Sequence, residues 1–302
     1  MHKDTPMKVY IPEICDRTSV FAVLGQVFNE DGECYSDRYL FNAEATSFID
    51  PFCVVLLNNL FAWLQVRGHA LRVMAPQEES DAAHLLLEYI HPEGAYPFND
   101  AINVHDALIP MAHIPIERSP SWVLTTFYRW LAEILGVSTL SLFTPMQFMR
   151  LLFQYAKHHG QSKGIFLHAS LDKESHQLHI LLAHYGEGIP DLTRSSWSSI
   201  SNPAVEIARA TEHNHLHDAH QSGEGSSLLF LVDDVIIENG GSVSIYSGFG
   251  HMQAARNELG ITQKLALSNA YVPGALFDIS FRIESTGLMS RINEPVDEVF
   301  SA

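Results

Sequence analysis

One short stretch is rich in side chains that bind metals: His213, His215, His217, His220, Glu212 and Asp218. Alternate residues of an extended chain point to the same side, so imidazoles at this spacing can face one ion. Imidazole and carboxylate groups bind Zn²⁺, Ni²⁺ or Cu²⁺. The other interpretation is a polar surface loop in a chain that has 17 histidines. A metal-responsive regulator is therefore one hypothesis for the function.

A second set of residues combines helix ends with glycine-rich turns. Three pieces follow in order: HHG at residues 158–160, LLAHYGEGIP at 181–190 and GEG at 223–225. In the middle piece an apolar run ends at Gly186 and Gly188. Glycine tolerates the dihedral angles and the crowding that arise where a backbone approaches a bulky group. These turns therefore indicate a ligand site.

In order and spacing, these pieces resemble the boxes of the histidine-kinase-like ATPase fold, which includes kinase catalytic domains, chaperone ATPases and anti-sigma-factor kinases. The resemblance covers about residues 120–283. It implies an α/β sandwich with a nucleotide site. The residues that would line this site are Tyr155, His159, His184, Gly186, Gly188, Gly223 and Gly225.

The resemblance also implies which groups must do the chemistry. ATPases of this fold need an Asn ligand for Mg²⁺, a Glu that polarises water and an Asp that accepts from adenine. The matching residues here are Tyr155, Leu151 and His184. A phenol is a poor Mg²⁺ ligand, leucine cannot move a proton, and imidazole lacks the paired oxygens of a carboxylate. We therefore predict no catalytic residue and no required cofactor, with ATP and Mg²⁺ as the alternative.

The N-terminal half has a clear helix signal. Asp50 can cap a helix in which Pro51 takes the first position and which Gly68 stops. The segment FIDPFCVVLL at 48–57 resembles the strand-to-helix turn of STAS domains, the anti-sigma-factor-antagonist fold. In that family the turn carries a phosphorylatable serine after the aspartate. Pro51 and Phe52 stand there instead, so no phosphorylation switch is expected.

Further elements must position these groups. Helices are predicted to begin at Ser119–Pro120, with Gly136 as the end, and at Thr144–Pro145. Another is expected at 81–90. Strands are predicted at 164–170, 177–183, 242–247 and 275–283, with a weakly apolar stretch at 197–220 and a polar excursion at 248–269.

These elements alternate in the manner of an α/β protein. We predict an STAS-like α/β domain at 1–116, a histidine-kinase-like ATPase α/β sandwich of the α+β type at 117–285, and an acidic tail at 286–302. The linker at 92–119 has few Gly and Ser residues and contains an apolar run, so we expect it to pack and to fix the two domains.

Charge and cysteine content exclude several classes of function. The formal net charge is -17, with 18 Lys and Arg against 35 Asp and Glu, which argues against nucleic acid and anionic membranes as partners. No apolar run is long enough to span a membrane. Three cysteines without a CxxC motif suggest neither a disulfide framework nor a thiolate zinc site, and fit the cytoplasm.

The leading hypothesis is a non-catalytic cytoplasmic regulatory protein that contacts a protein partner, with a degenerate nucleotide site. STAS domains and kinase-like ATPases are partners in anti-sigma-factor switching, so the resemblance implies a signalling role. The alternatives are an ATP-binding protein or serine kinase with an unorthodox site, and the metal-responsive regulator. The identity of the partner and the oligomeric state stay open.

Overall fold

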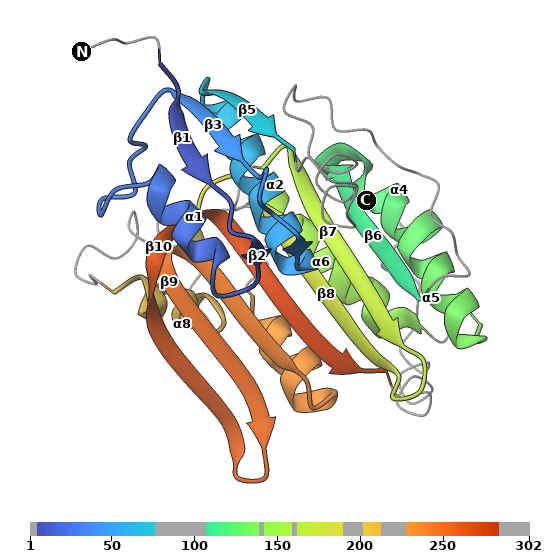
Figure 1. The fold of residues 1–302 in the computed structure, drawn as a ribbon. Helices are drawn as coiled ribbons and strands as arrows, with labels where there is room; N and C mark the ends of the chain where they lie inside the picture. The colour runs from blue at the N-terminus through green and yellow to red at the C-terminus, as the bar shows by residue number, and fades with distance from the viewer. Residues whose placement is uncertain are drawn as a thin grey trace.

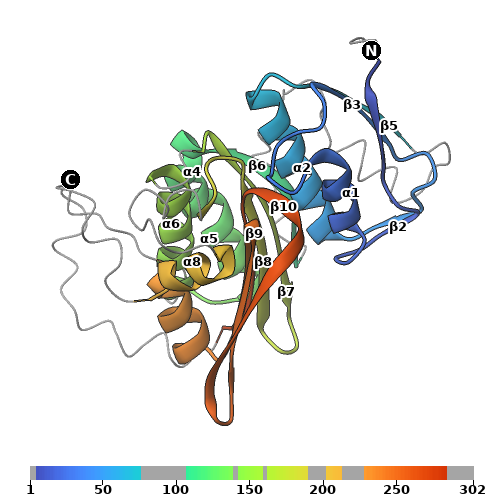
Figure 2. The ribbon, with the colours of Figure 1, turned by 90° about the vertical axis from the view of Figure 1, so that its left-hand side faces the viewer.

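The computed structural model describes residues 5–75, 107–138, 142–158, 162–189, 202–212 and 228–283. The described elements stack in four layers: a three-stranded sheet, a pair of helices, a five-stranded sheet and a second group of helices (Figures 1 and 2). The chain is thus a mixed α/β protein. The predicted helix at 81–90 and the tail at 286–302 lie outside the described residues.

The five-stranded sheet is antiparallel. Its order is β6 (Leu108–Pro115), β7 (Gly164–Asp172), β8 (Gln177–His184), β10 (Gly260–Arg282) and β9 (Ser242–Asn257). The inner strands are apolar along most of their length because both of their faces are covered. The strands predicted at 164–170, 177–183, 242–247 and 275–283 are confirmed within β7, β8, β9 and β10.

One face of this sheet carries the helices of the C-terminal part. They are α4 (Ser119–Trp122), η2 (Val123–Phe127), α5 (Tyr128–Leu135), α6 (Phe143–His158), α8 (Pro203–Ala210) and η4 (Leu231–Glu238), and the short η1 (Ile116–Arg118) precedes them. The first three are continuous, and Gly136 ends them in the left-handed conformation, with φ 63°. The predicted helix from Ser119–Pro120 to Gly136 is confirmed.

The other face is covered by the N-terminal part. Its elements are β1 (Met7–Tyr10), β2 (Ile14–Cys15), α1 (Val20–Val27), β3 (Arg38–Asn42), β4 (Phe48–Ile49), α2 (Pro51–Val66) and β5 (Ala70–Met74). Strands β1, β3 and β5 form a parallel sheet. The Asp50 side chain accepts a hydrogen bond from the Phe52 backbone N–H, which confirms the predicted cap of α2.

Helix α2 lies between the two sheets. Every residue from Phe52 to Leu64 is buried, because one side of the helix packs on the three-stranded sheet and the other on β7, β8 and β10. The Asn59 side-chain amide donates to the Pro273 carbonyl at 2.8 Å. Helix α2 and the five-stranded sheet therefore share one hydrophobic core, which includes Phe166, Leu181 and Leu276.

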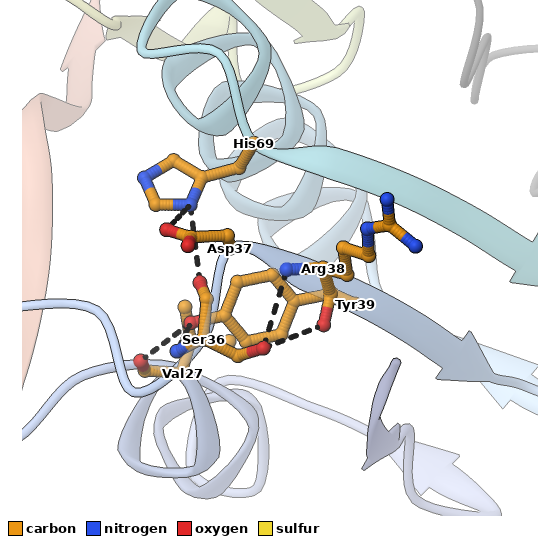
Figure 3. A network of polar contacts seen from close by, with 6 residues as sticks. All are labelled: Val27, Ser36, Asp37, Arg38, Tyr39 and His69. Carbon is orange, nitrogen blue, oxygen red and sulfur yellow. Dashed lines mark hydrogen bonds and ion pairs between the residues drawn. The ribbon is translucent and has the colours of Figure 1, made fainter. Parts of the chain in front are cut away.

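A polar network fixes the start of β3 (Figure 3). The Tyr39 hydroxyl donates to the Val27 carbonyl at 3.2 Å and accepts from the Ser36 backbone N–H at 2.9 Å. His69 Nδ1 lies 3.1 Å from the Ser36 carbonyl oxygen. Burial raises the pKa of Tyr39, so the phenol stays protonated and can donate. The network joins the end of α1 to the entries of β3 and β5.

The structure differs from the sequence predictions in three places. Residues 108–115, assigned to the N-terminal domain, form β6 and pair with β7 in the C-terminal sheet. The sequence predicted a polar segment between two strands at 248–269. In the structure, β9 and β10 continue through most of this segment and pair there as a hairpin. Helix α8 lies in the stretch for which no helix was predicted. The division into two domains itself stays a prediction.

Candidate functional site

Two residues of the predicted nucleotide site, Tyr155 and His184, meet in the structure. Tyr155 lies near the end of α6, and His184 is the last residue of β8. Their ring centroids are 6.1 Å apart in an edge-to-face arrangement, and both rings also contact Phe277. Tyr155 is 2% exposed and His184 is 0% exposed. The two side chains therefore fill the core between α6 and the sheet.

Burial sets the charge of both groups. It raises the pKa of Tyr155, so the phenol keeps its proton at neutral pH. It lowers the pKa of His184 to about 4, so the imidazole is neutral. Among the residues that the structure describes, neither His184 ring nitrogen has a hydrogen-bond partner. The pair thus offers no negative charge to a metal ion.

The glycine turn after β8 is tied to the sheet. The Ile189 backbone N–H donates to Ser247 Oγ at 2.9 Å, and the Ser247 hydroxyl donates to the Gly274 carbonyl. Gly274 has φ +66°, and a side chain there would collide with the His184 carbonyl. Gly186 is half-buried and Gly188 is buried. This part of the predicted box is therefore a close-packed turn beside His184.

The other predicted site residues lie outside the described part of the chain. They are His159, Gly223 and Gly225 of the nucleotide site and His213, His215, His217 and His220 of the metal site. Their roles stay predictions. Within the described ranges, no group of three or more His, Cys, Asp or Glu side chains is arranged to hold a metal ion.

A polar cluster on the opposite face of the sheet was not predicted. Asp278 of β10 is buried, and its carboxylate accepts from the Arg17 guanidinium and lies 2.6 Å from His179 Nε2 of β8. Arg17 belongs to the loop between β2 and α1, and its guanidinium also lies over the Phe52 ring, 5.1 Å from the centroid. The cluster therefore joins the N-terminal part to the C-terminal sheet.

Two titratable groups near this cluster, Tyr246 and His168, have shifted pKa values. Burial and the nearby carboxylate raise the pKa of Tyr246, whose ring stacks on His251 with centroids 4.1 Å apart. Burial, with a smaller effect of His179, lowers the pKa of His168 to about 4. Asp278 thus acts as the shared acceptor of one cation and one imidazole. Chemically this arrangement suits a clamp between layers.

One sequence signal could have found this cluster. Asp278 interrupts the apolar run ALFDISF, and His179 interrupts QLHILLAH, so each places a polar group within a strand that is otherwise apolar. A charge at such a position needs a partner. The identity of that partner depends on the register that sets β8 beside β10, which the sequence did not reveal.

Comparisons with models of known protein families, with curated proteins and with solved structures find no match. Among the described helices, none combines the length and the hydropathy that a membrane-crossing helix requires. The functional assignment therefore depends on the residues and contacts described above.

Proposed function

We propose that this chain is a non-catalytic regulatory protein, in which a kinase-like ATPase scaffold with a degenerate nucleotide site acts through contacts with a protein partner. One observation carries the proposal: Tyr155 and His184 pack ring against ring in the core. The resemblance assigns these two residues to the positions where an active ATPase needs a Mg²⁺ ligand and an adenine acceptor. The STAS-like character of the N-terminal part belongs to the same proposal.

The electrostatics of this pair support the loss of catalysis. Mg²⁺ prefers oxygen ligands, above all carboxylates and phosphates, and it keeps an octahedral shell. The raised pKa of Tyr155 keeps its phenol protonated, and the lowered pKa of His184 keeps its imidazole neutral. Leu151, one helical turn before Tyr155, has no group that can activate water. Phosphoryl transfer would thus lack its metal ligand and its base.

The contacts between the N-terminal part and the five-stranded sheet support a protein that acts by presenting a fixed surface to its partner. Helix α2 belongs to the core of both sheets, and the Arg17–Asp278 ion pair joins segments 261 residues apart. Such a shared core favours one fixed arrangement over domains that separate on a signal. The cytoplasm suits this function, because the three cysteines are all unpaired thiols.

Calorimetric titration with Mg-ATP tests the proposal directly. We expect no heat of binding at ligand concentrations up to about 1 mM, which corresponds to less than about 4 kcal/mol of binding free energy. The protein should be the full chain, with its fold checked by circular dichroism before and after the titration. A dissociation constant in the low micromolar range would overturn the proposal and favour a kinase or ATPase.

Nucleotide binding without hydrolysis is the second candidate, and one observation favours it. Both ring nitrogens of His184 are buried without a hydrogen-bond partner in the described part of the chain, which is costly unless something else satisfies them. A purine has donors and acceptors of the required kind. If titration with Mg²⁺-free ATP gives binding, the variant His184→Phe should weaken it about tenfold or more, and equal binding by that variant would exclude this candidate.

A further inference from the structure

The distal halves of β9 and β10 form a two-stranded arm. Here the two strands pair with each other from Gly250 and Leu267 to Asn257 and Gly260 at the tip. Figures 1 and 2 show the arm extending beyond the other described elements, with the tip at the lower edge of both views. Leu259, at the tip, is 98% exposed. The arm therefore presents its end and much of its surface to solvent.

The base of the arm is held firmly. Register shifts interrupt the β9–β10 pairing between Leu267 and Leu276, and the chain turns there. Tyr271, in this corner, packs against Phe28, Trp63 and Phe249, with ring centroids 5.0 to 6.4 Å apart. The corner thus fixes the direction of the arm relative to α1 and α2.

The edge that β10 forms in the arm is open among the described strands, as is the outer edge of β9. Between residues 275 and 282, β10 lies between β8 and β9, but residues 260–267 pair with β9 alone among the described strands. The second edge of this segment therefore offers unpaired backbone N–H and C=O groups. Proteins usually protect such an edge with prolines, bulges or several charges, and here only Lys264 is charged.

The open edge carries an unusual row of exposed apolar side chains. Leu259, Ile261, Leu265 and Leu267 occupy alternate positions of the tip and strand, and the last three are 46%, 42% and 61% exposed. Alternate residues lie on one face of a strand. Leu265 pairs with Met252, which is buried beside Thr211 at the end of α8. The exposed row therefore continues an apolar face that α8 covers mainly over β9.

The row is symmetric about its middle residue. Reading outward from Gln263, both directions give an apolar residue at two positions and another at four. Two copies of this segment can therefore pair antiparallel with Gln263 opposite its own copy, Ile261 opposite Leu265, and Leu259 opposite Leu267. In this register Lys264 faces Thr262 and not a second lysine. Apolar residues directly opposite each other stabilise strand pairs.

We propose that this edge is a homodimer interface, in which residues 259–267 of two copies pair antiparallel around a two-fold axis at Gln263. A symmetric dimer requires a self-complementary patch, and the spacing about Gln263 provides one. Charge also permits it. The arm has Arg256, Glu258 and Lys264, hence two cations and one anion, in a chain with a net charge of -17. The arm itself therefore does not share the strongly negative charge of the chain as a whole.

A cysteine at the axis tests the register. In a Cys34→Ser background, which removes a half-buried native thiol, Gln263→Cys places two thiols opposite each other across the axis. Gln253→Cys, on the exposed outer side of β9, is the matched control. Under mild oxidation we expect a disulfide-linked dimer to form at least about tenfold faster at position 263. Equal rates would overturn the proposal.

A charge exchange tests the pairing of side chains. Ile261→Glu and Leu265→Lys should each weaken the dimer at least about tenfold, because a charge then faces an apolar residue. The double variant should recover most of the loss, since each new Glu faces a new Lys of the partner copy. Both side chains are exposed, so neither substitution should change the melting temperature of the protomer.

Sedimentation velocity measures these effects at about 50 μM protein, where an interface with a dissociation constant of about 1 μM is largely dimeric. Three outcomes would overturn the proposal: a monomeric native chain at that concentration, a dimer that both single variants leave intact, or a double variant no stronger than the single ones. A monomeric chain whose arm binds an unrelated extended peptide would show that the edge serves a different protein.

Discussion

The two faces of the five-stranded sheet treat polar groups in opposite ways. On the face covered by α6, His184 is fully buried, and no described residue forms a hydrogen bond with either ring nitrogen. On the face covered by α1 and α2, Asp278 is also buried but accepts from both Arg17 and His179. The first face keeps its imidazole neutral, whereas the second provides its carboxylate with two hydrogen-bond partners. Burial alone therefore does not determine whether a polar side chain in this protein has hydrogen-bond partners.

The largest effect is expected where the rings fill the first face. Tyr155→Ala should lower the free energy of unfolding by about 4 kcal/mol, because a buried ring is replaced by a cavity beside Phe277. Tyr155→Phe keeps the ring and should cost about 1 kcal/mol. Urea denaturation followed by circular dichroism gives both values. A similar loss in the two variants would mean that the hydroxyl, and not the ring, holds this face together.

Acid should act on the first face through His184. The folded protein lowers the pKa of this imidazole from 6.5 to about 4, so the unfolded chain binds the proton first. Above pH 6.5 both states are neutral and the site adds no pH dependence. As the pH falls from 6.5 to 4, protonation of the unfolded chain lowers the free energy of unfolding by up to about 3 kcal/mol.

The variant His184→Phe isolates this contribution. It removes the titrating group and retains a ring of similar size, so its free energy of unfolding should fall less between pH 7 and pH 4 than that of the native chain. At pH 7 the variant should be about as stable, because two unpartnered nitrogens are lost with the imidazole. Parallel pH profiles for the two proteins would contradict the assignment.

A smaller effect is expected on the second face. Asp278→Asn should cost about 1 to 2 kcal/mol, less than a fully buried pair, because the Arg17 side chain is half exposed. Combined with Arg17→Met in a double-mutant cycle, it should give a coupling energy of about 1 kcal/mol. Arg129→Met is the control, since the exposed Arg129–Glu133 pair within α5 should contribute under about 0.5 kcal/mol. A coupling energy near zero would exclude the clamp.

Local signals predicted helix ends well. Asp50 with Pro51, and Ser119 with Pro120 and Gly136, each marked a helix that the structure contains. Asn202 with Pro203 carries the same signal at the start of α8. That helix was not predicted, because its surroundings are weakly apolar and gave no periodicity. A cap is a property of a few neighbouring residues, so it can be found from the sequence without knowledge of the fold.

Long-range contacts could not be predicted in this way. The segment 248–269, which contains the arm, has mostly exposed residues in its second half. The alternation of apolar and polar residues that marks a half-buried strand is therefore weak there. The partners of Asp278 are distant in sequence and meet only through the sheet order. The resemblance to a family assigned Tyr155 and His184 to one site, but the packing of their rings against each other was not predicted. Composition and periodicity did not indicate it.

The position of α2 between two sheets bears on the order in which the chain folds. The buried residues 52–64 of α2 pack against the five-stranded sheet, and this sheet is incomplete until β10 has been synthesised. About 190 residues separate the end of α2 from β10. At synthesis rates of about 5 to 20 residues per second, α2 waits for roughly 10 to 40 s on the ribosome before that surface exists. During this interval its apolar side is open to chaperones and to other nascent chains. Slower translation of the C-terminal half should therefore favour aggregation, and an N-terminal fragment ending near residue 75 should be insoluble when expressed alone.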